Sequence, residues 1–142
     1  MYLDMALNFG AAVSDHATIL ACTDLAGTGV TLFNNYACWT GTRESLQLAA
    51  RRGMQVPDCP TGVILGSPAR VAHNDAGQFT FGAVLRGTGV TVLNDGGRWM
   101  FDPGAGLIKI AREGDPIPWF GGGQSWKVIG GSLGTINVWS DG

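Results

Sequence analysis

An internal repeat is the feature of this sequence that most constrains its fold. The run GTGVTLFNNYACW at residues 27–39 returns as GTGVTVLNDGGRW at residues 87–99, sixty positions later. After a one-residue slip the match continues, from LQLAARRGMQVP to LIKIAREGDPIP. A fixed period of this kind is typical of a chain that uses one supersecondary unit more than once. We therefore predict one domain over residues 1–142, made of two repeats at about 14–73 and 74–139, with Ser140-Asp141 matching the start of a third.

The second copy predicts that the unit is made of strands. QFTFGAVL, residues 78–85, is aromatic and β-branched, GVTVL follows, and the turn Asn94-Asp95-Gly96-Gly97 leads into RWMF, a pattern typical of a β-hairpin. LIKIA, residues 107–111, lies between two breaker clusters and supplies a fourth strand. We expect positive φ angles in this turn and in its counterpart Asn34-Asn35, because Asn and Gly tolerate them best.

The first copy of the fourth strand is ambiguous on propensity. ESLQLAARRGM, residues 44–54, is rich in helix-favouring residues. Equivalent positions in a repeat should share a fold, and LIKIA is a poor helix, so we predict a strand here too. The pattern does not fix its buried face, because Leu48 aligns with Lys109 and Gln47 with Ile108.

Four antiparallel strands per unit are typical of β-propeller blades and of β-solenoid coils. Sixty residues are long for a coil and fit a blade with loops, so we predict an all-β, β-propeller-like tandem repeat, with a β-sandwich or barrel as the alternative. Two units are too few to close a propeller of about four to eight blades. The sequence thus predicts a homo-oligomer, a dimer or trimer closed between chains.

Composition excludes several classes of protein. Charged residues make up 14% of the chain and the net charge is -2, which argues against a disordered tail and against a nucleic-acid partner. No apolar run approaches the roughly 18 residues of a membrane span. The start of the chain carries Asp4 where a signal peptide needs basic residues, so no signal peptide is predicted in this chain and localisation stays open.

Cysteine and histidine spacing predicts no metal site and no cofactor. Cys22, Cys38 and Cys59 show no CxxC spacing, and their odd number leaves at least one unpaired within the chain while allowing one disulfide. His16 and His73 do not occupy equivalent positions, and neither has a second ligand at metal-binding spacing.

The second unit resembles the bacterial NxxGxxxF choice-of-anchor tandem-repeat proteins. The positions that carry the resemblance are Asn74, Gly77, Phe81, Gly89, Trp99, Arg112, Gly114 and Asp115. The first unit departs from the pattern, with Ser14, Ala17 and Ala21 in place of the Asn, Gly and Phe. The resemblance implies a repeat architecture and a surface or exported protein, and it implies no catalytic residue.

Two recurring polar features have both a structural and a binding interpretation. Asn74-Asp75 could contribute oxygen ligands to calcium, or could cap a turn before a strand, and we favour the turn. Arg51 and Arg112 recur at equivalent positions. We favour a structural tie between these guanidinium groups and neighbouring carbonyl groups or an Asp, over a ligand contact.

The tryptophans divide into two groups. Trp39 and Trp99 recur and are predicted to be buried in the core at equivalent positions, whereas Trp119 and Trp126 lie in a glycine-rich segment. Because aromatic faces stack on sugar rings, these two are the better ligand-binding candidates. Arg112 and Asp115 complete the set of candidate ligand-binding residues.

We consider three classes of function. The first is a non-enzymatic structural or binding module of a bacterial surface or exported protein, since the repeated positions are turn and core types. The alternative is a lectin-like module that binds carbohydrate through Trp119 and Trp126. A hydrolase that uses clustered carboxylates ranks last, because no nucleophile, metal site or phosphate loop accompanies Asp102, Glu113 and Asp115.

Overall fold

The computed structural model describes residues 12–13, 18–116, 125–130 and 136–141. Within these residues the regular elements are β-strands, and they pair antiparallel, which confirms the all-β class. No helix in this part of the chain is long and apolar enough to cross a membrane.

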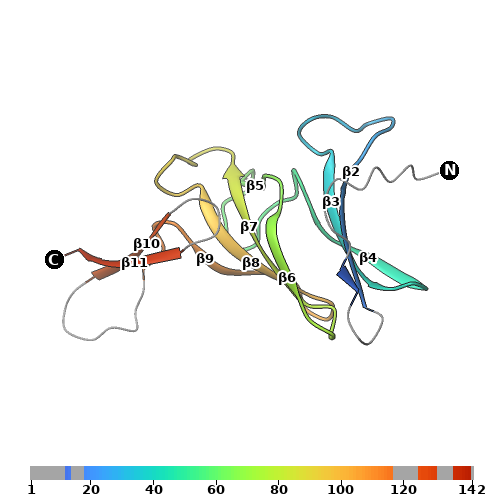
Figure 1. Ribbon diagram of the computed structural model, residues 1–142. Coiled ribbons are helices and arrows are strands. Elements are labelled where there is room, and N and C mark those ends of the chain that lie inside the picture. The colour runs from blue at the N-terminus through green and yellow to red at the C-terminus, as the bar shows by residue number, and fades with distance from the viewer. Residues whose placement is uncertain (1–11, 14–17, 117–124, 131–135, 142) are drawn as a thin grey trace.

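The first sheet is a four-stranded meander in which each strand pairs with its neighbour in sequence (Figure 1). Its strands are β1 (Ala12–Val13), β2 (Ile19–Asp24), β3 (Tyr36–Thr42) and β4 (Ser45–Arg51). The strand predicted for ESLQLAARRGM is therefore confirmed as β4. Pairing with β3 overrides the helical propensity of its Leu, Gln and Ala residues.

The second sheet has the same meander order, but two short strands share one edge of its longest strand. Its strands are β5 (Ile64–Leu65), β6 (Ala69–His73), β7 (Phe79–Arg86), β8 (Gly96–Asp102) and β9 (Gly106–Arg112). Both β5 and β6 pair with β7. A separate hairpin, β10 (Ser125–Gly130) with β11 (Ile136–Asp141), lies beyond the second sheet, at the end of the molecule away from the first sheet (Figure 1).

The two sheets have the same strand register when residues sixty positions apart are compared. Ala21 faces Trp39 in the first sheet, and Phe81 faces Trp99 in the second. Each sheet also has a β-bulge at the same place, just before that tryptophan, where the register to the next strand shifts. The one-residue slip of the repeat falls in the following hairpin, whose turn contains residues 43–44 in the first sheet and residues 103–105 in the second.

The GVTVL segments are not strands, so that part of the prediction is wrong. Residues 25–35 and 87–95 form loops that connect the second and third strands of each meander. The positive φ angles lie at Gly27 and Gly29 and at their counterparts Gly87 and Gly89, not at the Asn and Asp residues. Gly96 and Gly97, expected in the turn, instead begin β8. β-branched composition favoured a strand, but these segments find no partner strand among the described residues.

The core lies between the two sheets. Because successive side chains of a strand point to opposite faces, the inner face of each sheet can be read from the register. The first sheet contributes Leu20, Cys22, Cys38 and Thr40, and the second contributes Phe79, Phe81, Trp99 and Phe101. The apolar members form one continuous buried cluster. Ring centroids of neighbouring aromatic residues in it lie 5.5 to 6.2 Å apart.

A polar contact joins the sheets at one end of this core. Thr40 in β3 donates a hydrogen bond of 3.1 Å from its hydroxyl to the carbonyl oxygen of Gly77, and Thr18 donates one of 3.0 Å to that of Asp75. Gly77 has a φ of +75°, and a Cβ placed on it would lie 3.5 Å from both threonine side chains. The turn between β6 and β7 therefore fits directly against β3 of the first sheet.

The two repeated tryptophans differ in burial, which corrects the expectation that both are core residues. Trp99 is fully buried, whereas Trp39 is half-buried on the outer face of the first sheet. The bulge leaves Ala49 and Ala50 of β4 buried, while Leu46 and Leu48 are 50% and 45% exposed. The second sheet covers one face of the first, so the equivalent residues of the two sheets meet different neighbours.

Candidate functional site

Each long loop is held by one asparagine side chain. Asn94 Oδ1 accepts a hydrogen bond of 2.8 Å from the Thr91 amide, and its Nδ2 donates one of 3.1 Å to the Gly89 carbonyl oxygen. Asn34 makes the same two hydrogen bonds in the first sheet, at 2.7 and 3.1 Å, with Thr31 and Gly29. The loop conformation is therefore fixed by local polar contacts.

The repeated arginines attach these loops to the sheets. Arg112 Nε donates a hydrogen bond of 2.7 Å to the carbonyl oxygen of Asn94, and Arg51 Nε donates one of 2.8 Å to that of Asn34. Both side chains are half-buried. The predicted structural tie between guanidinium and carbonyl groups is confirmed at both positions.

Asp115, the candidate ligand-binding residue grouped with Arg112, makes contacts within its own hairpin. Its Oδ2 accepts a hydrogen bond of 2.9 Å from the Arg112 amide and lies 3.1 Å from Lys109 Nζ. In the first sheet the Met54 sulfur accepts the corresponding hydrogen bond, 3.0 Å from the Arg51 amide. A sulfur atom fills the same role as the carboxylate, so the contact with the main chain does not require a negative charge.

The carboxylates of the hydrolase hypothesis lie at opposite ends of one hairpin. Asp102 is opposite Gly106 where β8 turns into β9, whereas Arg112, next to Glu113, is opposite Gly97 at the other end. Gly97 and Asp102 are five residue steps apart along β8, which is roughly 16 Å at about 3.3 Å per residue. Paired glycosidase carboxylates lie about 5 to 9.5 Å apart, so Asp102 does not share a site with Glu113 or Asp115.

Asp102 has a structural role at the β8–β9 turn. Its Oδ1 accepts hydrogen bonds of 2.8 and 2.9 Å from the amides of Gly104 and Ala105, and its Oδ2 accepts one from Gln78 Nε2. The Gln78 side chain first, and then the two amides, lower the pKa of the Asp102 carboxyl below its ordinary value of 3.8. Hydrogen bonds to the ionised form have this effect because protonation breaks them.

The Asn74 segment forms the turn that we favoured over a calcium site. Asn74 Oδ1 accepts hydrogen bonds of 3.1 Å from the amides of Ala76 and Gln78, which is the geometry of an Asx turn. The described residues contain no group of three or more His, Cys, Asp or Glu side chains that could hold a metal ion.

The two tryptophans proposed to bind sugar are mostly beyond what the structure describes. Trp119 lies outside the described residues, and Trp126 is placed only as a backbone position of β10, opposite Ser140. The carbohydrate hypothesis that depends on them stays a prediction.

A shallow open depression of about 230 Å³ lies at the end of the second sheet near the Asn74 turn. Its lining residues are Ala72, His73, Asn74, Gln78, Phe79, Thr80 and Met100. They come from β6, β7, β8 and the turn between β6 and β7, and the sequence analysis did not find them because only strand pairing brings these segments together. The lining is mainly apolar, and the described residues contribute no carboxylate and no lysine to it.

One family model matches the chain, over residues 5–120, and it is described as a family of unknown function, DUF7453. The chain belongs to this family. The match contains both sheets of the DUF7453 chain and ends before the β10–β11 hairpin. No curated protein and no solved structure matches it.

The DUF7453 chain contains one disulfide, between the directly opposed Cys22 of β2 and Cys38 of β3. Both cysteines are buried on the inner face of the first sheet, while Cys59 is free and half-buried. Cys59 Sγ lies 3.6 Å from Arg112 Nη1. The sequence allowed one disulfide, and the strand register decides which pair forms it.

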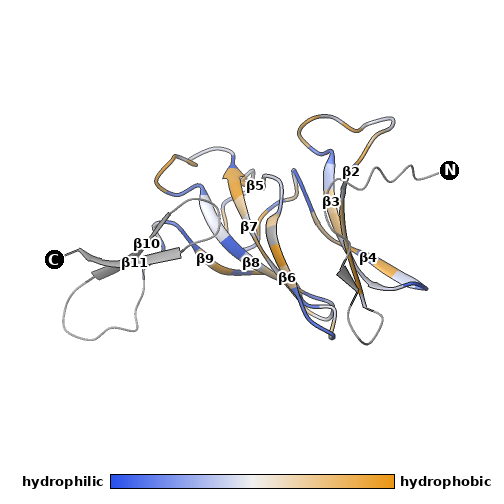
Figure 2. Ribbon diagram, in the orientation of Figure 1, coloured by the Kyte–Doolittle hydropathy of each residue, from blue (hydrophilic) through white to orange (hydrophobic). Residues whose placement is uncertain are grey.

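The two loops of the DUF7453 chain also carry exposed apolar tips. Leu32 and Phe33 are 76% and 66% exposed, and Val92 and Leu93 are 83% and 80% exposed. Figures 1 and 2 show both loops projecting from the same side of the two sheets, with hydrophobic segments at their ends.

Proposed function

We propose that this DUF7453 chain is a non-enzymatic structural or binding module of an exported bacterial protein, built from two blade-like units stacked face to face in a β-propeller-like arrangement. The observation that carries the proposal is the shared strand register of the two sheets together with the common core between them.

The use of the repeated polar residues supports a structural role. Asn34 and Asn94 hold loops, and Arg51 and Arg112 tie those loops to strands. Active sites, in contrast, usually gather titratable groups with perturbed pKa values in a cleft. Asp102, whose pKa is lowered, accepts hydrogen bonds at a hairpin turn from the Gln78 side chain and from two amides, and no other titratable side chain takes part in these contacts.

The disulfide supports an exported protein. Disulfides form and persist in oxidising compartments such as the periplasm or the extracellular space and are rare in the cytosol. Cys22–Cys38 agrees with the surface or exported origin implied by the resemblance to the choice-of-anchor repeats. Alkylation of the unreduced protein purified from a periplasm should modify Cys59 only, and modification of all three cysteines would contradict this part of the proposal.

Hydrogen exchange tests whether the two sheets form one module. Replacing both Cys22 and Cys38 by Ser removes a crosslink that closes a loop of 16 residues in the first sheet, at a cost of about 3 kcal/mol. If the sheets share one core, amides in β7 and β8 of the second sheet should lose protection as well.

The matched control is Cys59→Ser, which leaves the crosslink intact and should leave protection in both sheets unchanged. Loss of protection confined to β2 and β3 in the double variant would show that the sheets unfold independently. That result would overturn the stacked module.

A further inference from the structure

The outer face of the second sheet corresponds to a surface that is covered in the first sheet. By register, Thr80, Gly82, Arg98 and Met100 occupy the positions of Leu20, Cys22, Cys38 and Thr40. The latter four are buried beneath the second sheet. Thr80, Arg98 and Met100 are only half-buried, and two of them line or adjoin the open depression.

The outer face of the first sheet corresponds to a surface that is covered in the second sheet. Its Ile19, Ala21 and Trp39 occupy the positions of Phe79, Phe81 and Trp99, which are buried against the first sheet. The former three are half-buried. Leu46 and Leu48 of β4 extend this outer face and are about half exposed, so it is apolar across β2, β3 and β4.

We propose that these two faces are an interface for a second copy of this chain: the outer face of the first sheet of one copy docks on the outer face of the second sheet of the other. The inference rests on the proposed stacking, because it extends to two chains the sheet-on-sheet contact that exists within one. A sheet with an apolar face is stable when another layer covers that face.

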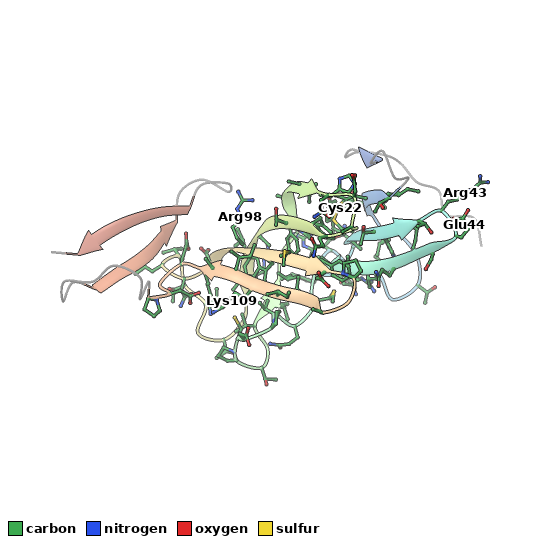
Figure 3. All side chains as sticks on the ribbon, turned by 90° about the horizontal axis from the view of Figure 1, so that it is seen from below. Cys22, Arg43, Glu44, Arg98 and Lys109 are labelled. Carbon is green, nitrogen blue, oxygen red and sulfur yellow. A yellow bond between two sulfur atoms is a disulfide. The ribbon has the colours of Figure 1, made fainter. Side chains whose placement is uncertain are left out.

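The composition of the faces fits this occupant. The outer face of the second sheet offers Met100 and its cross-strand partner Ile108, with Thr80 beside them. Arg98 Nε lies beside Gly82, since a Cβ on Gly82 would lie 3.9 Å from it. Figure 3 shows the Arg98 side chain projecting from the ribbon of the second sheet. The opposing face presents the half-buried Trp39 together with Leu46 and Leu48 to these side chains.

The contact is heterologous, because a face of one sheet meets a different face of another. Heterologous contacts close into rings when the rotation between copies allows it and otherwise form open chains. We therefore expect a homo-oligomer, either a closed ring or an open chain of copies.

Two charge substitutions test the interface by blocking one face each. Leu48→Glu blocks the outer face of the first sheet, and Met100→Glu blocks that of the second. Both should fold, because the equivalent positions already hold a charged residue, Lys109, and a polar one, Thr40. Leu93→Glu is the control: it places the same charge on a side chain that is 80% exposed but belongs to neither face.

Size exclusion with light scattering at tens of micromolar gives the readout. The unsubstituted protein and Leu93→Glu should elute as the same oligomer, and each face variant alone should be a monomer. An equimolar mixture of the two face variants should form a 1:1 dimer and nothing larger, because each supplies the face that the other lacks.

Three results would overturn the inference: a monomeric unsubstituted protein, association that persists in both face variants, or a mixture that stays monomeric. Each of these leaves the stacked module intact, because hydrogen exchange measures coupling of the two sheets within a monomer. Conversely, independent unfolding of the sheets would remove the basis of both proposals.

Discussion

Arg112 Nε donates a hydrogen bond of 2.7 Å to the main-chain carbonyl oxygen of Asn94, so the end of β9 holds the base of the loop that precedes β8. Asn94 in turn closes that loop with its own side chain. The loop contains no strand, and these contacts maintain its shape.

We expect Arg112→Lys to lower the free energy of unfolding by about 1.5 to 3 kcal/mol, the range for a hydrogen bond to a charged group. Lysine keeps the charge but lacks the planar Nε donor. Urea unfolding followed by tryptophan fluorescence measures the change. Arg86→Lys, an exposed arginine at the end of β7, is the control and should be nearly neutral. Equal effects of the two substitutions would contradict a specific role for the Arg112–Asn94 bond.

The two repeated tryptophans should differ in their contribution to stability. Trp99→Ala removes a fully buried side chain and should cost about 3 to 5 kcal/mol. Trp39→Ala, at the equivalent but half-buried position, should lower the free energy of unfolding of the monomer by clearly less. Chemical denaturation of both variants, made in the Met100→Glu background to prevent association, gives the comparison. Equal losses would mean that Trp39 is as well packed as Trp99.

The threonine contact between the sheets should be measurable by itself. Thr40→Val keeps the side-chain shape but removes the donor to the Gly77 carbonyl oxygen, which leaves a buried acceptor without its partner. The expected loss is about 1 to 3 kcal/mol. Thr42→Val, on the same strand at an exposed position, should change stability by less than about 0.5 kcal/mol. If Thr40→Val leaves the free energy of unfolding unchanged, the Thr40–Gly77 hydrogen bond does not stabilise the packing of the two sheets.

Asp102 should make the free energy of unfolding depend on pH. Its pKa is lowered in the folded state, chiefly by Gln78 and then by the amides of Ala105 and Gly104. The folded state then binds fewer protons than the unfolded state, so the contribution of Asp102 is complete above its ordinary pKa of 3.8 and is lost as the pH falls through the folded value.

Urea unfolding of the unsubstituted protein and of Asp102→Asn at pH 6 and pH 3 tests this. The unsubstituted protein should be the more stable at pH 6, and its advantage should shrink at pH 3. A difference that stays constant over this interval would show that the Asp102 carboxyl titrates normally in the folded protein.

The sequence by itself determined the all-β class, the strand at β4 and the role of the repeated arginines. The repeat made this possible, because a strand that is ambiguous in one copy, such as ESLQLAARRGM, is unambiguous in the other, and an arginine retained while its neighbours change indicates a main-chain contact. These properties depend on backbone geometry, which the two copies share.

Only the tertiary structure decided which face of each sheet is buried. Trp39 and Trp99 have the same register and the same bulge, yet the second sheet packs on the face of the first that holds Cys22 and Cys38 and leaves Trp39 on the other. Similarly, GVTVL has the composition of a strand but becomes a loop with exposed Val92 and Leu93. Burial depends on what lies across from a residue, and that neighbour belongs to another part of the chain, which local pattern does not specify.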